Sequence, residues 1–175
     1  FYLYGMGATK DYIKAAEWYR KAADQGDVDA QYKLGLFYEN GYGVAQNKEE
    51  AVKWYRKSAE NGNASAQLNL GICYANGEGV EKNSAKAVEW YRKSAENGNA
   101  DAQFNLGVCY ANGKGVEKDS AKAVEWYKKA AEQGQDSAQC NLGYCYKNGI
   151  GVEKDVIKAT EWYQKSAEQG NCTAQ

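Results

Sequence analysis

The chain has 175 residues, of which 43% are apolar and 13% aromatic, and its formal net charge is -1. This composition supplies the apolar side chains of a folded core, which excludes a disordered chain. The near-neutral charge lacks the basic excess of phosphate-binding proteins, so nucleic acid is not expected as a partner. Because no stretch approaches about 18 consecutive apolar residues, no membrane span is expected in this segment.

A tryptophan followed by a tyrosine recurs along the chain, and every interval is 36 residues. The five tryptophans are Trp18, Trp54, Trp90, Trp126 and Trp162. Repetition at one period is typical of a solenoid, in which each unit buries its apolar face against the next. We therefore predict one solenoid segment over residues 1–175, with a partial repeat at 1–27, repeats at 28–63, 64–99, 100–135 and 136–171, and the start of a further repeat at 172–175.

The first predicted helix of each repeat, helix A, is represented by residues 100–112. Ala102, Leu106 and Tyr110 fall on one side of a helical wheel, so we expect them in the core. Gly107 lies in the middle of this helix, where glycine costs about 1 kcal/mol relative to alanine. A bulky neighbour should need that space, and the adjacent tryptophan ring is the candidate.

The second predicted helix, helix B, covers roughly residues 83–97 in the third repeat. Its expected buried stripe consists of Ala87, Trp90, Tyr91, Ser94 and Ala95, opposite a charged, solvated face. Each helix B follows a residue that can cap its free amides: Asp11, Asn47, Asn83, Asp119 or Asp155. Because the chain has 19 glycines and no proline, we expect short helices joined by tight turns.

The repeats resemble the Sel-one-like repeat (SLR), a 36-residue relative of the tetratricopeptide repeat. The resemblance rests on the recurring motif Ala-Gln-x-x-Leu-Gly-x-x-Tyr-x-Asn-Gly-x-Gly-Val, followed by Asp or Asn and then by Lys-Ala-x-Glu-Trp-Tyr-x-Lys. It covers essentially the whole chain. It implies an all-α fold, a right-handed superhelical α/α solenoid of antiparallel helix pairs, and a function as a protein-protein interaction scaffold or adaptor.

The two ends of the chain fall inside a repeat. Phe1-Tyr2 aligns with Phe37-Tyr38 near the end of a helix A, and Ala174-Gln175 stands where another helix A should begin. Solenoids normally end in capping units with a polar outer face, and neither end has the pattern of one. We therefore expect a segment of a longer repeat protein, although a trimmed chain would look the same.

One branch of the SLR resemblance is disulfide-rich: the secreted helicobacter cysteine-rich proteins, once classed as beta-lactamases. The resemblance places their bridge between positions seven residues apart, which match Ala95 and Ala102 in the third repeat. All five such pairs in this chain are alanines. The disulfide branch and its enzymatic label therefore match poorly, and close packing of small residues is expected instead.

The cysteines of this chain lie elsewhere. Cys73, Cys109 and Cys145 occupy one helix A position in successive repeats. Stacked helices lie about 8–10 Å apart, beyond the roughly 7 Å Cα limit for a disulfide, so buried free thiols are expected. Cys140 and Cys172 have no cysteine counterparts in other repeats. The pattern weakly favours the cytoplasm or another reducing compartment.

Catalytic and metal-binding patterns are missing from the sequence. Without histidine, the Ser-His and Cys-His nucleophile pairs cannot form, and no phosphate-loop pattern occurs in a credible setting. The recurrent Gly-x-Gly lacks the strand and third glycine of a dinucleotide site, so it indicates turn geometry. Without histidine or a Cys-x-x-Cys pair, a metal site is not expected. We predict no enzyme, no catalytic residue, no metal and no cofactor.

Comparison of the repeats with one another locates a candidate site. Positions that the fold requires should recur, whereas positions that contact a partner are free to differ. The differences concentrate on the side of helix A opposite the core stripe, which lines the concave groove of tetratricopeptide-like superhelices. The candidate partner-binding residues are Tyr32, Lys33, Leu36, Leu68, Asn69, Ile72, Phe104, Asn105, Val108, Cys140, Asn141 and Tyr144.

Several functions remain open from sequence. The apolar members of this set either line a groove for a protein or peptide ligand or pack, half-exposed, between adjacent A helices. The array could instead be a structural spacer within a larger multidomain protein, or it could self-associate end to end. Distant resemblance alone adds a third alternative, the binding of a beta-lactam or an envelope glycan.

Overall fold

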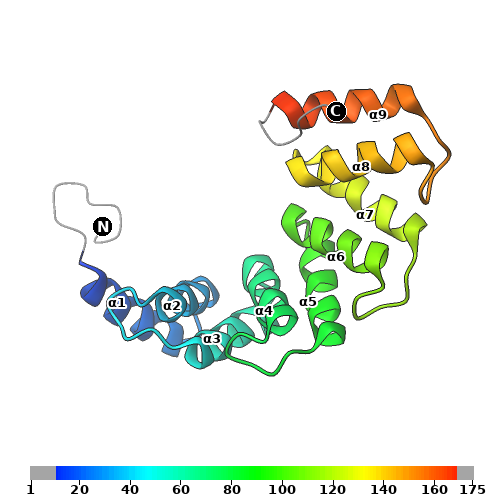
Figure 1. Cartoon of the computed structure of the whole chain (residues 1–175). Coiled ribbons are helices and arrows are strands. Elements are labelled where there is room, and N and C mark those ends of the chain that lie inside the picture. Colours follow the sequence, from blue (N-terminus) through cyan, green and yellow to red (C-terminus); the bar gives the residue numbers. More distant parts are fainter. Residues whose placement is uncertain (1–10, 169–175) are drawn as a thin grey trace. The chain divides into compact units, whose positions relative to one another are not determined.

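The computed structural model describes residues 11–168, and all regular structure in this range is helical (Figure 1). Within each of the two units described next, consecutive helices pack against each other, and the all-α prediction is confirmed. The chain divides into two compact units between Asn83 and Ser84. The helices of the described range are α1 (Tyr12–Asp24), α2 (Val28–Asn40), α3 (Lys48–Glu60) and α4 (Ala64–Asn76) in the first unit, and α5 (Ser84–Glu96), α6 (Ala100–Asn112), α7 (Ser120–Glu132), α8 (Asp136–Asn148) and α9 (Val156–Glu168) in the second.

The even-numbered helices are the predicted A helices and the odd-numbered ones the B helices. Three residues separate α1 from α2, and α7 from α8, and connections this short join antiparallel neighbours. No helix between residues 11 and 168 is long and apolar enough to cross a membrane. Each unit is thus a stack of short helix pairs.

The B helices begin where the capping residues predict. The Asp119 side chain accepts a hydrogen bond of 3.0 Å from the Lys122 amide, which has no partner within the helix. This hydrogen bond lowers the pKa of the Asp119 carboxyl below its ordinary value. Asp11, Asn47 and Asp155 accept the same hydrogen bond at the start of three other B helices, so the prediction is confirmed there too.

Each Gly-x-Gly combines a helix end with a close backbone contact. Gly113 follows α6 with φ of 68°, and its amide donates to the Cys109 carbonyl. Gly115 has φ of 73°, and a Cβ built on it would lie 2.1 Å from the carbonyl oxygen of Ser84, the first residue of α5. Only glycine lets the loop approach the preceding B helix this closely. The interpretation of Gly-x-Gly as turn geometry is confirmed.

The core follows the predicted stripes. Leu106 is fully buried, and Ala95 and Ala102 are buried together, as expected for alanines that replace a bridge. The buried Gln103 amide also donates to the Ala95 carbonyl over 3.1 Å, which ties the start of α6 to the end of α5. Equivalent bonds from the other repeats link Gln31 to Ala23, Gln67 to Ala59 and Gln139 to Ala131.

The mid-helix glycines make room for tyrosine, so the prediction of a tryptophan neighbour is wrong. A Cβ on Gly107 would lie 2.7 Å from the Tyr127 ring. The preceding side chain on a helix points about 100° away. Trp54, which precedes Tyr55 on α3, accordingly packs with Ala23 and Leu34 and not against a mid-helix glycine. Trp90, predicted to be buried, is only half-buried.

Cys73, Cys109 and Cys145 are buried free thiols, as predicted. Cys140, in contrast, is disulfide-bonded, and Cys172 lies outside the described residues. A disulfide at Cys140 removes the support that the cysteine pattern lent to a reducing compartment.

The three free thiols should not react while the protein is folded. Burial raises the pKa of Cys73 to about 12 and also raises the pKa of Cys109 and of Cys145. At pH 8 the folded protein therefore keeps them protonated, and the thiolate is the reactive form. We expect no labelling by iodoacetamide at pH 8 in buffer and full labelling in urea, measured by mass spectrometry. Rapid labelling of the native protein would contradict the observed burial.

Candidate partner-binding site

The twelve residues predicted from sequence lie on the A helices, three on each of α2, α4, α6 and α8. Eleven of them are half-buried, and Tyr144 is exposed, with 55% of its surface accessible. Both interpretations, groove lining and packing between helices, expect half-buried side chains. The second unit contains examples of both, because Val108, Asn141 and Tyr144 line a pocket whereas the Phe104 ring packs against Tyr127.

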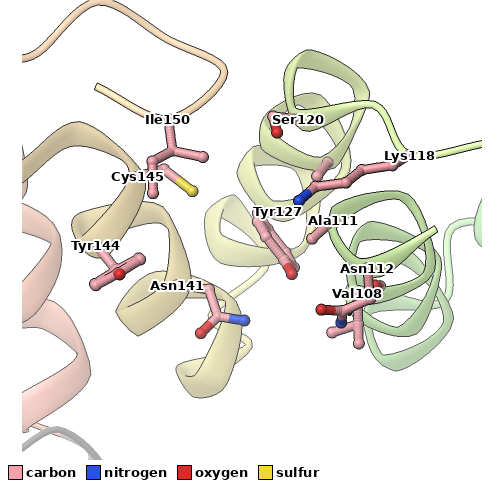
Figure 2. Close-up of a pocket in the computed structure, with 11 residues that line it drawn as sticks. Val108, Ala111, Asn112, Lys118, Ser120, Tyr127, Asn141, Tyr144, Cys145 and Ile150 are labelled. Carbon is pink, nitrogen blue, oxygen red and sulfur yellow. Dashed lines mark hydrogen bonds between the residues drawn. The ribbon is translucent and has the colours of Figure 1, made fainter. Parts of the chain in front are cut away.

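This pocket lies between α6 and α8 and has a volume of about 500 Å³. Figure 2 shows side chains from α6, α7, α8 and their loops arranged around it. It brings together three of the predicted residues, Val108, Asn141 and Tyr144. The other lining residues are Ala111, Asn112, Lys118, Ser120, Ala123, Tyr127, Cys145 and Ile150.

Tyr127 of α7 supplies the aromatic wall of the pocket. It is 4% exposed, and the Phe104 ring lies 6.0 Å from it, centroid to centroid. Burial raises the pKa of Tyr127 to about 12, while a hydrogen bond with the Asn141 side chain acts in the opposite direction. The Tyr127 hydroxyl is therefore neutral at pH 7 and available as a donor.

The pocket has a polar and an apolar side. Lys118 in the loop before α7 and Ser120, the first residue of α7, line it, and in Figure 2 the Lys118 side chain runs toward Tyr127. Val108 and Ile150 are aliphatic. The cavity thus combines aliphatic side chains with groups that can fix a ligand by hydrogen bonds, as sites that bind a small group or a side chain do.

Sequence reasoning missed several of these residues. Tyr127 recurs in every repeat, so it was assigned to the framework. Lys118 and Ile150 lie in loops, outside the helix face on which the comparison of repeats concentrated. Their variation was nevertheless a signal, because Glu78 stands where the later repeat has Ile150. The predicted residues Phe104, Asn105 and Cys140 do not line this pocket.

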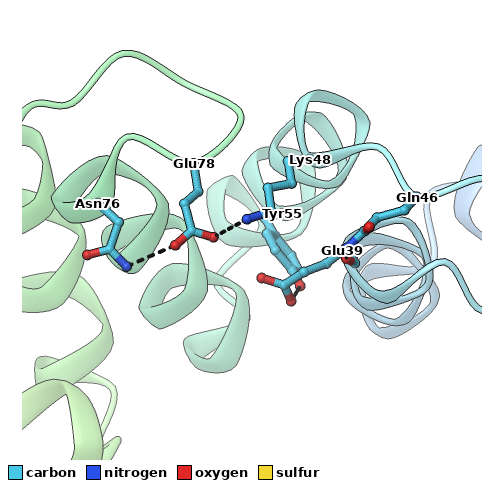
Figure 3. A network of polar contacts seen from close by, with 6 residues as sticks. All are labelled: Glu39, Gln46, Lys48, Tyr55, Asn76 and Glu78. Carbon is cyan, nitrogen blue, oxygen red and sulfur yellow. Dashed lines mark hydrogen bonds and ion pairs between the residues drawn. The ribbon is translucent and has the colours of Figure 1, made fainter.

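The matching place in the first unit, two repeats earlier, is occupied by polar side chains. There the Tyr55 hydroxyl donates to the Glu39 carboxylate over 2.6 Å. Lys48 and Glu78 form an ion pair of 2.9 Å, and Asn76 also donates to Glu78 (Figure 3). The hydrogen bond between them raises the pKa of Lys48 and lowers that of Glu78. In the first unit the Tyr55 hydroxyl and the Lys48 amine thus have carboxylate partners within the protein.

The described residues contain no group of three or more histidine, cysteine or acidic side chains that could hold a metal ion. Asp119, which stands between the pocket residues Lys118 and Ser120, caps α7 and pairs with the Lys122 amine over 3.1 Å.

The pocket and its helix pairs belong to a repeat that the family comparison recognises. The model of the Sel1 repeat matches residues 1–27, 28–63, 64–99, 100–135 and 136–171. The chain belongs to the Sel1 repeat family. Sel1 repeat proteins form all-α solenoids and are generally protein-interaction scaffolds without catalytic activity. None of the curated proteins compared with the chain matches it significantly.

Solved structures of other Sel1 repeat proteins are similar over nearly the whole chain. One is a protective antigen of uropathogenic Escherichia coli strains, with 45% identity and a TM-score of 0.94 over 97% of this chain and 36% of that one. Another is a Sel1 repeat protein of Oxalobacter formigenes, with 44% identity and a TM-score of 0.90 over 97% of this chain and 68% of that one. The present chain therefore spans about a third of the length of the first relative and two thirds of the second.

The cysteine-rich protein B of Helicobacter pylori is more distant. It has 28% identity and a TM-score of 0.60, over 77% of this chain and 96% of that one. The similarity extends to the stacking of helix pairs. It does not extend to the bridge positions assigned by resemblance, because this chain has alanine there.

Proposed function

We propose that this Sel1 repeat chain is a non-enzymatic adaptor that binds a peptide segment of a partner protein through its A helices. The observation that carries the proposal is the pocket between α6 and α8, beside the exposed Tyr144. An exposed aromatic ring next to a partly apolar pocket is the type of surface on which interaction energy concentrates. The other predicted groove residues remain part of the proposed surface.

The exposed side chains suffice for a moderate affinity. A ligand that covers the exposed Tyr144 and Ile150 would gain up to roughly 1.5–3 kcal/mol for each side chain, and less at the half-buried Val108. Association and the ordering of a flexible peptide offset much of this gain, which leaves roughly micromolar affinity. Such an affinity suits a reversible adaptor.

Photo-crosslinking tests the proposed surface. Tyr144 is replaced by the photoreactive residue p-benzoylphenylalanine, and the crosslinked peptides are identified by mass spectrometry. Ile157 on α9 is 76% exposed and lies outside the pocket, so it provides the matched control. We expect crosslinks from position 144 to converge on one segment of one partner, and those from position 157 to be few and scattered. Equal, scattered crosslinks from both positions would overturn the proposal.

A further inference from the structure

Two places in the chain have the same architecture and different side chains. In each, two consecutive A helices flank the tyrosine of the B helix between them. The first lies among α2, α3 and α4 around Tyr55, and the second among α6, α7 and α8 around Tyr127. Positions two repeats apart correspond, so each side chain in one place can be compared with its counterpart in the other.

In the first unit, the tyrosine hydroxyl already donates its hydrogen bond to a glutamate side chain. Glu39 of α2 reaches Tyr55, and its carboxylate accepts the hydroxyl proton over 2.6 Å. Tyr55 is fully buried, and its hydroxyl also hydrogen-bonds the Asn69 side chain. The tyrosine hydroxyl of this architecture can therefore bind a carboxylate, and the protein itself supplies one.

In the second unit, the carboxylate is missing. Ala111 takes the place of Glu39, while the matching tyrosine and asparagine, Tyr127 and Asn141, are retained. Both line the open pocket. The hydroxyl donor that Glu39 satisfies in the first unit therefore faces pocket space in the second.

The second pocket, which lacks the glutamate, has a positive charge in its lining. Lys118 lines the second pocket where the first unit has the neutral Gln46. Among residues 11–168 Lys118 forms no ion pair, and the neighbouring Asp119 is engaged with Lys122. The first unit has its lysine two positions further along, at Lys48, and Glu78 pairs with it (Figure 3). The second pocket thus presents a cation and a hydroxyl donor to whatever enters it.

We infer that the pocket between α6 and α8 binds a glutamate side chain of a partner polypeptide, an inference that rests on the proposed adaptor function. The carboxylate accepts hydrogen bonds from the Tyr127 hydroxyl and the Lys118 amine. The methylenes lie against Val108 and Ile150, and Tyr144 covers the adjacent residue of the partner. Glutamate is favoured over a phosphate, because one cation and one hydroxyl match a single negative charge.

The proposal is tested with small peptides, so that no partner needs to be known. Acetyl-Glu-Leu-amide, acetyl-Gln-Leu-amide and acetyl-Ala-Leu with a free C-terminus are each titrated into the whole chain. Binding is followed by NMR at the side-chain amide of Asn141, with Asn69 as the reporter of the first unit. We expect saturable shifts at Asn141, about tenfold tighter binding of the Glu peptide than of the Gln peptide, and no shift at Asn69. Equal binding of the Glu and Gln peptides would overturn the inference. Tightest binding of the free C-terminus would also overturn it, in favour of a chain-end site.

Two substitutions test the roles of the pocket residues. Ala111→Glu should reproduce the Glu39 contact and abolish peptide binding, because the pocket then holds a carboxylate of its own. Gln164→Glu on α9 adds the same charge at an exposed position outside the pocket and should leave binding unchanged. Lys118→Gln, which installs the residue of the first unit, should weaken binding of the Glu peptide about tenfold and of the Gln peptide little. Undiminished binding by a folded Ala111→Glu variant would refute the inference.

These results are separable from those of the adaptor proposal. Convergent crosslinks from position 144 without discrimination between Glu and Gln would support the adaptor and refute the carboxylate site. Glu-specific shifts at Asn141 without convergent crosslinks would support the pocket chemistry and refute its use for a partner protein.

Discussion

Substituting Gly115 by alanine should lower the free energy of unfolding by roughly 2–5 kcal/mol. Gly115 has φ of 73°, and the left-handed region costs a residue with a Cβ roughly 1–2 kcal/mol. The new Cβ would also lie 2.1 Å from the Ser84 carbonyl oxygen and 2.4 Å from its carbonyl carbon. Backbone atoms cannot rotate away as a side chain can, so the loop between α6 and α7 must move, and overpacking of this kind adds roughly 1–3 kcal/mol.

The control for this substitution is Gly134→Ala. Gly134 has φ of 88° and belongs to the same unit, but a Cβ built on it would meet nothing within 4 Å. It therefore carries the conformational cost of about 1–2 kcal/mol without the clash. Urea unfolding followed by circular dichroism measures both variants. Equal losses of stability would show that the loop tolerates the Cβ and that only the dihedral angle matters.

The same substitution should disturb the proposed site. The loop after Gly115 leads to Lys118 and Ser120, which line the pocket between α6 and α8. A loop pushed away from Ser84 carries Lys118 with it. We therefore expect weaker binding of the Glu peptide by Gly115→Ala even at temperatures at which the variant is folded.

The helical framework could be predicted from the sequence because it repeats. Leu106 and Tyr110 recur at the helical period on one side of helix A, and a capping residue such as Asp119 precedes each helix B. These signals are local, and a position that packs in the same way in every repeat carries the same residue type each time. The core and the helix starts therefore followed from spacing alone.

The pocket was only partly predictable, because it is open where the first unit has a glutamate side chain. Val108, Asn141 and Tyr144 were found because their positions differ between repeats. Ala111 gives no signal of its own, since an alanine on a half-exposed helix face is unremarkable in any sequence. Its effect appears only when the structure shows that Glu39 fills the equivalent space and hydrogen-bonds the tyrosine.

Gly107→Ala should cost about 2 kcal/mol of stability, although helix propensity alone predicts a gain. Alanine is favoured over glycine by roughly 1 kcal/mol inside a helix. The new Cβ, however, would lie 2.7 Å from two carbons of the Tyr127 ring and 3.3 Å from the Ala123 carbonyl oxygen. The ring is 4% exposed and cannot swing into solvent, so overpacking of up to about 3 kcal/mol outweighs the gain in propensity.

A double-mutant cycle with Tyr127→Leu identifies the cause of the loss. Leucine leaves space beside position 107, so in this background Gly107→Ala should be neutral or stabilising. The two substitutions should thus couple by about 2 kcal/mol, measured by urea unfolding. If Gly107→Ala destabilises both backgrounds equally, the glycine is required for another reason. If it stabilises the wild-type chain, the tyrosine ring has moved, and the pocket whose wall it forms must then change shape as well.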